Sequence, residues 1–314
     1  MDRVQLLVAV VGPTGSGKST LALHLAKQYD GEIINFDSLQ IYRFLQIGTA
    51  KVPLYAREGI PHHLTDLLNP DEVFTAGDFS RHGRAVLNDL SGRGKLPVAV
   101  GGTGFYLRAL LEGLFRGPQR DEALRSRLAA RAERRPGSLH RLLRRFDPAA
   151  ARRIHANDIN KVIRALEVCL TARRPLTELF TEGRDRLQGW EVIKLGVDPP
   201  RPALYERLER RTPEMFQQGL LQEVQEILHM GYSAESKAFD AIGYRETLQL
   251  LKGELTRDEA VALTLRNTRR YAKRQWTWFR RDPEVTWLKG FGDDPAICAE
   301  ASALVRKRLA RDSG

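Results

Sequence analysis

Short apolar segments alternate with amphipathic segments along much of this chain. Continuous apolar runs of strand length occupy residues 4–11, 32–36, 96–100 and 190–198. Runs of this kind are typical of strands that are buried on both faces of a parallel sheet. Segments with one apolar side follow them and predict helices at residues 19–27, 74–90, 105–112 and 201–211. The alternation favours an α/β fold with a parallel sheet.

Residues 116–188 follow a different rhythm, because the strand pattern stops and helical patterns succeed one another. Helices are expected at 121–134, 138–146 and 162–170, and Pro136-Gly137 separates the first two. The strand pattern then resumes. We therefore expect a discontinuous core, residues 1–115 and 189–314, that carries a helical insertion at residues 116–188.

The part of the chain after the last apolar run reads as mostly helical. Thr212 and Pro213 suit an N-cap and a first helical position, which predicts a new helix from there to about residue 230. A glycine-marked turn at 239–246 precedes helices at 257–281 and 296–311. Cationic and aromatic residues interleaved between 269 and 281 can bind phosphates and stack bases. Trp276 and Phe279 are expected to face the core instead.

The first apolar run leads into a glycine-rich loop that fits the phosphate-loop pattern GxxxxGK[ST] at every fixed position. Its residues are Gly12, Pro13, Thr14, Gly15, Ser16, Gly17, Lys18 and Ser19. Loops of this kind point successive backbone N–H groups at phosphate oxygens, while the lysine adds a charge and the serine can ligate Mg²⁺. A chance glycine-rich turn is the alternative, and the strand before and helix after it argue against that.

Two polar residues follow other predicted strands and should face the same crevice, because ligands of α/β sheets lie beyond the carboxyl ends of strands. Asp37 follows the second run, where it suits either a catalytic acid or a helix cap. Thr103 follows Gly101-Gly102 after the third run. Nucleoside triphosphatases need an acid to position magnesium and water, and this strand ends in glycines and a threonine.

Charge and composition narrow the class of protein. The 314 residues carry a net charge of +11, and residues 116–153 hold twelve arginines against four acids, or +8 of that total. Clustered guanidinium groups suit phosphate contacts, although any one of them can simply be solvated. Cys169 and Cys298 are isolated, and His62-His63 has no further ligand at metal spacing. No apolar run approaches a membrane span, so a cytoplasmic protein is expected.

Together these segments resemble the tRNA dimethylallyltransferases. The similar blocks, in order, are GPTGSGKS, the DS after the second strand, GGTGFYLRALLEGL, IHANDINKVIRALEV, AIGYRE and RRYAKRQWTWF. The resemblance implies a phosphate-loop core with a helical insertion that grips the anticodon stem-loop of tRNA. It also implies transfer of a dimethylallyl group from its diphosphate to N6 of the adenine 3′ of the anticodon, with magnesium. A monomer is expected.

Roles follow from the resemblance block by block. Gly12 to Ser19 would bind the diphosphate or a nucleotide, with Ser19 on the metal, and the catalytic residues would be Lys18, Asp37, Thr103 and Arg211. Thr103 also belongs to the residues expected to contact tRNA, with Asp37, Ser38, Leu39, Gln40, Asn160, Lys161, Val162, Ile163, Arg164, Asp240, Ala241, Ile242, Gly243, Tyr244 and Arg245. The chain departs from the usual family pattern at Ala156, Lys161 and Thr212-Pro213.

The chemistry of the residues fits this interpretation. A departing diphosphate needs donors aimed at its developing charge, which loop amides, Lys18 and an arginine supply. Adenine N6 must lose a proton, and Asp37 is the acid suited to accept it. A small-molecule kinase with the same core and a nucleic-acid-binding triphosphatase are the competing hypotheses.

Overall fold

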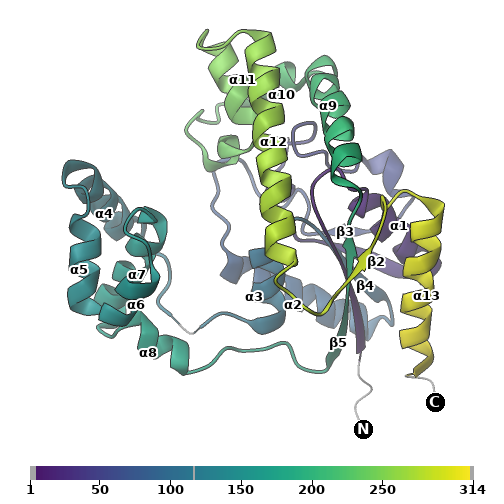
Figure 1. Ribbon diagram of the computed structural model, residues 1–314, viewed down its shortest axis with the longest axis horizontal. Coiled ribbons are helices and arrows are strands. Elements are labelled where there is room, and N and C mark those ends of the chain that lie inside the picture. The colour runs from purple at the N-terminus through teal and green to yellow at the C-terminus, as the bar shows by residue number, and fades with distance from the viewer. Residues whose placement is uncertain (1–4, 116, 312–314) are drawn as a thin grey trace. The chain divides into compact units, whose positions relative to one another are not determined.

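A computed structural model describes residues 5–115 and 117–311, so the expected strand residue Val4 and the insertion residue Arg116 lie outside the described residues. Six parallel strands form one sheet in the order β3-β2-β4-β1-β5-β6. The strands are β1 (Gln5–Val11), β2 (Gly31–Asn35), β3 (His62–His63), β4 (Leu96–Val100), β5 (Trp190–Val197) and β6 (Val285–Leu288). The predicted α/β class is confirmed (Figure 1).

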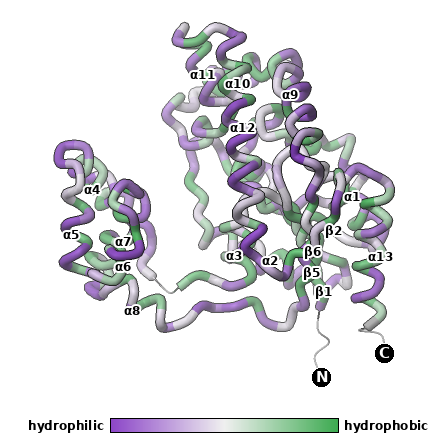
Figure 2. Tube along the Cα trace, viewed as in Figure 1, coloured by the Kyte–Doolittle hydropathy of each residue, from purple (hydrophilic) through white to green (hydrophobic). Residues whose placement is uncertain are grey.

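The central strands are apolar because both of their faces are covered. Every residue of β2 and β4 is buried, and β1 pairs with β4 through Val8 and Val98 and with β5 through Val8 and Ile193. Figure 2 shows green, the colour of apolar residues, along much of these strands. The main core cluster joins the sheet to α1 (Lys18–Gln28) and to α13 (Pro295–Arg311).

The chain folds into two compact units, Met1–Leu111 with Leu187–Gly314, and Glu112–Arg186. The second unit holds only helices among its described residues: α4 (Glu122–Arg134), α5 (Ser138–Phe146), α6 (Pro148–Arg153), α7 (Ile159–Ala172) and α8 (Leu176–Thr181). Its own core is built around α7, with Leu139 and Leu143 of α5 packed against it. The expected boundaries, 116 and 188, fall within a few residues of this division.

Helices of the first unit complete the frame of the site. They are α2 (Ala76–Gly92), α3 (Gly104–Glu112), α9 (Arg201–Gln217), α10 (Leu220–His229), α11 (Tyr244–Leu251) and α12 (Arg257–Phe279), with short 3₁₀ turns at Leu54–Arg57 and Lys237–Asp240. In Figure 1, α12 runs from the region of α10 and α11 down to the strands. It packs against α9 and α11.

One expected helix boundary is wrong. Thr212-Pro213 does not start a new helix, because α9 continues through Pro213 to Gln217. The buried side of α9 runs on across the proline from Leu208 to Phe216, and this packing offsets the lost backbone hydrogen bond. The Thr212 hydroxyl donates a hydrogen bond to the Leu208 carbonyl at 2.8 Å. The break occurs at Gly219, whose φ of 105° suits glycine.

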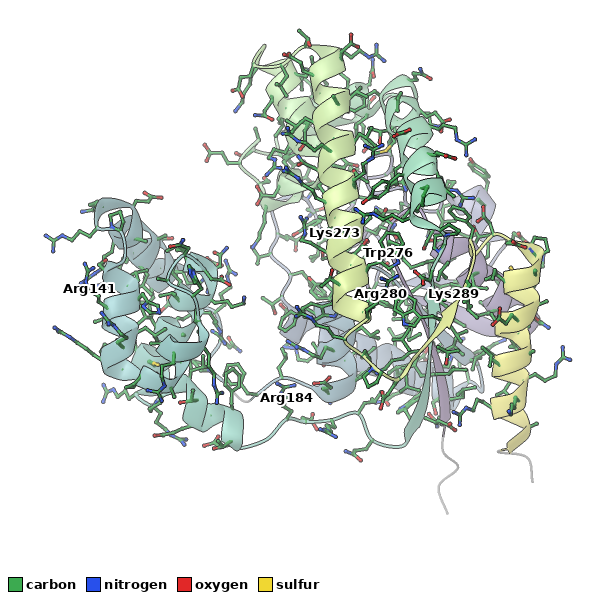
Figure 3. All side chains as sticks on the ribbon, viewed as in Figure 1. Arg141, Arg184, Lys273, Trp276, Arg280 and Lys289 are labelled. Carbon is green, nitrogen blue, oxygen red and sulfur yellow. The ribbon has the colours of Figure 1, made fainter. Side chains whose placement is uncertain are left out.

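The end of α12 is anchored to the sheet by a buried carboxylate. Asp198, which directly follows β5, accepts hydrogen bonds from Trp276 Nε1 at 2.8 Å, Arg280 at 3.1 Å and Lys289 at 2.6 Å. Figure 3 labels these three donors. Burial acts to raise the pKa of Asp198, but Lys289 and Arg280 together outweigh it and lower that pKa. Trp276 and Phe279 are buried as expected. None of the described helices is long and apolar enough to cross a membrane.

Candidate active site

A cavity of about 320 Å³ lies beyond the carboxyl ends of β1, β2 and β4, all within the first unit. The phosphate loop, the strand ends and side chains of α9 and α12 line it. The lining residues are Thr14, Gly15, Gly17, Lys18, Ser19, Thr20, Asn35, Asp37, Gln40, Thr49, Ala50, Val100, Gly101, Gly102, Arg207, Arg211 and Gln275. We call this space the central cavity, and it is the position that the sheet topology predicts for a ligand.

The glycine-rich loop has the conformation that its sequence predicts between β1 and α1. Gly12 has φ of 139°, and a Cβ there would stand 2.6 Å from the Val197 carbonyl oxygen, so close packing against β5 requires glycine. Gly17, with φ of 87°, precedes the first residue of α1. The positive end of α1 and its free N–H groups therefore face the central cavity, which suits a phosphate group.

Lys18, Asp37 and Arg211 form a charged triad at this cavity. Their side chains keep partial access to solvent, yet protein atoms surround them closely. Burial lowers the pKa of Lys18 to about 8, with Arg211 acting the same way and Asp37 opposing it. Burial raises the pKa of Asp37, against the Leu39 N–H at 3.0 Å from Oδ1 and the charge of Lys18. Asp37 is thus both a turn-capping acceptor and a carboxylate of increased basicity.

Thr103 lies where the β2 and β4 ends meet. Its hydroxyl oxygen accepts the Ser38 N–H at 3.0 Å and stands 3.2 Å from the Ser38 hydroxyl. Tyr271 of α12 also hydrogen-bonds this hydroxyl, and burial followed by the nearby charge of Asp37 raises the pKa of the tyrosine. Thr103 and Asp37, which are far apart in the sequence, therefore belong to one polar cluster.

Gln275 is a site residue that the sequence did not predict. Its side-chain oxygen accepts the Thr14 N–H at 2.7 Å, and its amide nitrogen donates to the Gly102 carbonyl at 3.2 Å. The glutamine thus ties the phosphate loop to the end of β4. No local pattern marks it, because it stands between cationic and aromatic residues that dominate this part of α12.

Arg207 and Arg211, one turn apart on α9, have different surroundings. Arg207 bonds Asp293 at 3.0 Å and lies over the Phe291 ring at 3.8 Å from its centroid. It also approaches the Gly15 carbonyl at 3.5 Å. Arg211 interacts electrostatically with Asp37, and burial lowers its pKa. Arg211, rather than Arg207, is therefore the arginine that interacts with the Asp37 carboxylate.

Some of the residues expected to contact tRNA in the first unit are exposed, and others are buried. Gln40 Nε2 bonds the Thr49 carbonyl at 3.1 Å, which leaves Gln40 on the cavity wall beside Ser38 and Leu39. Asp240 and Arg245 are exposed, and Ile242 is half-buried. Ala241, Gly243 and Tyr244 are buried. For these three residues the expected contact with tRNA stays a prediction, and the structure shows that they pack in the interior.

Tyr244 holds a loop of the cavity wall. Its hydroxyl donates to Glu223 and accepts the Gly48 N–H at 3.1 Å, while Glu223 also accepts the Ile47 N–H at 2.9 Å. Burial raises the pKa of Glu223. The wall residues Thr49 and Ala50 follow directly. Tyr244 of the AIGYRE block thus holds in place the loop that contributes Thr49 and Ala50 to the cavity wall.

The residues of α7 that are expected to contact tRNA, in the helical unit, also differ in exposure. Asn160 and Lys161 are exposed, and Lys161 pairs with Asp158. Val162 and Ile163 are buried in the unit's core, and their expected contact with tRNA stays a prediction. Arg164 bonds the buried Glu167 at 2.7 Å and the Pro118 carbonyl at 3.1 Å. It therefore orders the start of the unit.

Most arginines of the insertion remain available at the surface. Arg120 pairs with Glu122, and Arg125 with the buried Glu167. The remaining described arginines up to residue 153 are exposed and make no ion pair with a described acid: Arg127, Arg131, Arg134, Arg135, Arg141 (labelled in Figure 3), Arg144, Arg145, Arg152 and Arg153. An exposed surface of this charge suits a polyanion.

The cavity fits a magnesium ion that arrives with phosphate oxygens. Among the described residues, no three His, Cys, Asp or Glu side chains form a cage for a metal. Mg²⁺ is commonly held by one or two protein oxygens, water and substrate phosphates. The Ser19 hydroxyl at the start of α1 and the Asp37 carboxylate line the same cavity and offer such oxygens.

The parallel sheet, the phosphate loop and the charged triad define a phosphate-loop α/β enzyme. Comparison with known proteins identifies its family. The family described as IPP transferase matches residues 40–282. A tRNA dimethylallyltransferase of Solibacter usitatus is 57% identical over 96% of this chain and 99% of that protein. One of Koribacter versatilis is 55% identical, over 96% and 98% respectively.

Solved structures agree with this assignment. The tRNA isopentenylpyrophosphate transferase of Bacillus halodurans is 36% identical with a TM-score of 0.73, over 99% of this chain and 98% of that one. A eukaryotic dimethylallyltransferase, described as acting on tRNA, is 28% identical with a TM-score of 0.83, over 98% of this chain and 80% of its own. The chain belongs to the tRNA dimethylallyltransferase family.

Proposed function

We propose that this enzyme transfers a dimethylallyl group from dimethylallyl diphosphate to the exocyclic N6 of the adenine immediately 3′ of the anticodon (A37) in tRNA. The observation that carries the proposal is the pairing of a phosphate loop with a basic carboxylate, Asp37, in one cavity. The end of β4 carries Thr103 in place of a water-positioning acid, which disfavours triphosphate hydrolysis. Membership of the family disfavours a small-molecule kinase.

In the proposed reaction, the bond between the allylic carbon and the diphosphate oxygen breaks, and its electron pair leaves with the diphosphate. Adenine N6 forms the new N–C bond and gives its proton to Asp37. The loop N–H groups, Lys18 and Arg211 stabilise the charge on the leaving group. Thr103, held by Ser38 and Tyr271, is suited to orient the adenine. Bound Mg²⁺, with Ser19 as a ligand, would add further charge to that end of the cavity.

The arginines of the helical unit are proposed to hold the anticodon stem-loop through its phosphates, which frees the target base to be flipped into the cavity. We further propose that the enzyme acts as a monomer, in the cytoplasm. A phosphate loop need not bind ATP, because the diphosphate of the allylic donor presents the same oxygens to it.

The test uses the full chain with Mg²⁺, dimethylallyl diphosphate and unmodified tRNA, followed by mass analysis of the digested RNA. We expect N6-dimethylallyladenosine at one position and none when that adenine is replaced by guanine. Absence of the modified nucleoside, with ATP consumed in the presence of a small-molecule acceptor, would support the kinase hypothesis.

A further inference from the structure

An arginine lies between two exposed aromatic rings on the surface of the first unit. The Arg108 guanidinium carbon is 5.2 Å from the ring centroid of Phe105 and 5.1 Å from that of Trp278. Phe105 is 42% exposed and Trp278 38% exposed, although both rings are large and apolar. An arginine over aromatic rings gains cation–π attraction, and exposed apolar surface rimmed by polar groups is a feature of interaction sites.

The charge around these rings is positive and lacks acid partners. Trp278 shares one side of α12 with Arg274, four residues before it. Arg281 follows just after the end of the helix. Arg108, Arg274 and Arg281 are exposed and make no ion pair with an acid in the described part of the chain. Arg280, by contrast, pairs with Asp198. The unpaired set is therefore free to meet phosphates.

Two of these residues are close in the chain to residues that line the central cavity: Phe105 follows Gly102 by three positions, and Trp278 follows Gln275 by three. The Trp278 indole covers Gly104, where any Cβ would clash with it, and Gly104 directly follows Thr103. Gln275, a cavity residue, lies one turn before Trp278 on α12. A nucleotide next to a base in the cavity would thus be within reach of the rings.

We infer that Phe105, Arg108 and Trp278 form a stacking platform for an unpaired RNA base that neighbours the target adenine. The inference rests on the function proposed above and extends it to a second nucleotide. Single-stranded RNA loops are recognised by stacking of splayed bases on aromatic rings and arginine planes. Arg108, Arg274 and Arg281 would hold the flanking phosphates.

The experiment compares Trp278→Ala and Trp278→Phe with the control Tyr55→Ala, whose ring is 89% exposed at a distant 3₁₀ turn. Affinity for an anticodon stem-loop is measured with each protein at fixed salt, and thermal melting checks that Trp278→Ala folds. We expect Trp278→Ala to weaken binding roughly 5- to 150-fold, the effect of one lost base stack, and Trp278→Phe to retain most of it.

A series of stem-loops with one abasic nucleotide at each loop position then locates the base. One abasic position should weaken binding to the natural protein and have no further effect on Trp278→Ala. Unchanged affinity of Trp278→Ala, or equal loss with every abasic position, would overturn the platform. Reduced use of dimethylallyl diphosphate at normal RNA affinity would assign the rings to the donor instead.

Single-turnover transfer by the natural protein separates this inference from the proposed function. If the natural protein prenylates the stem-loop and Trp278→Ala binds it normally, only the platform is wrong. If the natural protein forms no product, the proposed reaction itself fails. An Arg108→Gln variant should bind RNA more weakly than the natural protein at low salt, and the two affinities should converge at high salt. The matched control, Arg306→Gln on α13, should bind RNA as the natural protein does.

Discussion

Replacing Asp37 by asparagine tests the proposed proton transfer most directly. The substitution keeps the shape of the side chain and an oxygen that can accept the Leu39 N–H, so the turn after β2 should persist. It removes the base. General-base catalysis contributes roughly 10²- to 10⁴-fold, and single-turnover transfer should slow by about that factor.

The expected decrease in transfer by Asp37→Asn has a second cause, which involves Lys18. Asp37 raises the pKa of Lys18, which burial holds at about 8, so its loss lowers that pKa further. At about pH 8, less than half of Lys18 would then be charged, and diphosphate binding would weaken as well. Assays at about pH 6.5 and saturating donor keep Lys18 charged and isolate the effect of the missing base.

The rate should also depend on pH in a stated direction. Asp37 accepts a proton only when ionised, and burial raises its pKa, so transfer by the natural enzyme should fall as acid is added through that raised pKa. Asp37→Asn should lose this acid limb. The control Asp282→Asn removes a carboxylate that pairs with Lys194 away from the cavity, and should keep it. Near-normal transfer by Asp37→Asn would show that Asp37 only caps the turn.

Three further predictions concern other parts of the molecule. Lys18→Ala should reduce transfer steeply and raise the KM for the diphosphate with stem-loop affinity unchanged; weakened RNA binding with a normal donor KM would contradict the placement of the loop. Glu32, whose pKa Arg93 chiefly lowers to about 2, should stabilise the fold above pH 4.5 and lose this contribution as the pH falls to about 2, so Glu32→Gln should unfold more easily in urea at neutral pH but not at pH 2. The last change neutralises four exposed arginines of the helical unit together: Arg134, Arg135, Arg144 and Arg145. The slope of log stem-loop affinity against log salt should become less steep by about 0.7 to 0.9 for each phosphate that is no longer neutralised. An unchanged slope would assign RNA binding to α12 instead.

The sequence predicted what local pattern determines. Fully buried strands and the phosphate loop are recognisable because each depends on residues adjacent in the chain. The two shortest edge strands, β3 and β6, were missed, since an edge strand of few residues has no apolar run of its own. Pro213 was misread because distant packing, which no local pattern reports, keeps α9 continuous.

The candidate site was predictable only where a motif carried it. Lys18, Asp37 and Thr103 follow strands whose ends must meet, so their proximity could be inferred from topology. Gln275 and Tyr271 come from a helix that ends more than 160 residues after Thr103, and only the fold brings them to it. The sequence also does not show which residues of a motif are buried, as Val162 and Tyr244 illustrate.

The hydrogen bonds around Gly48 limit how the cavity could be changed to accept a different allylic diphosphate. Gly48 has no space for a side chain, because a Cβ would clash with the Tyr244 ring, and the loop it belongs to supplies Thr49 and Ala50 to the cavity wall. Moving this part of the wall outward, to admit a longer allylic chain, therefore requires more than a change at Gly48. The position of this wall is set by Tyr244 and Glu223, so an engineered enzyme would have to repack α10 and α11 to move the loop outward.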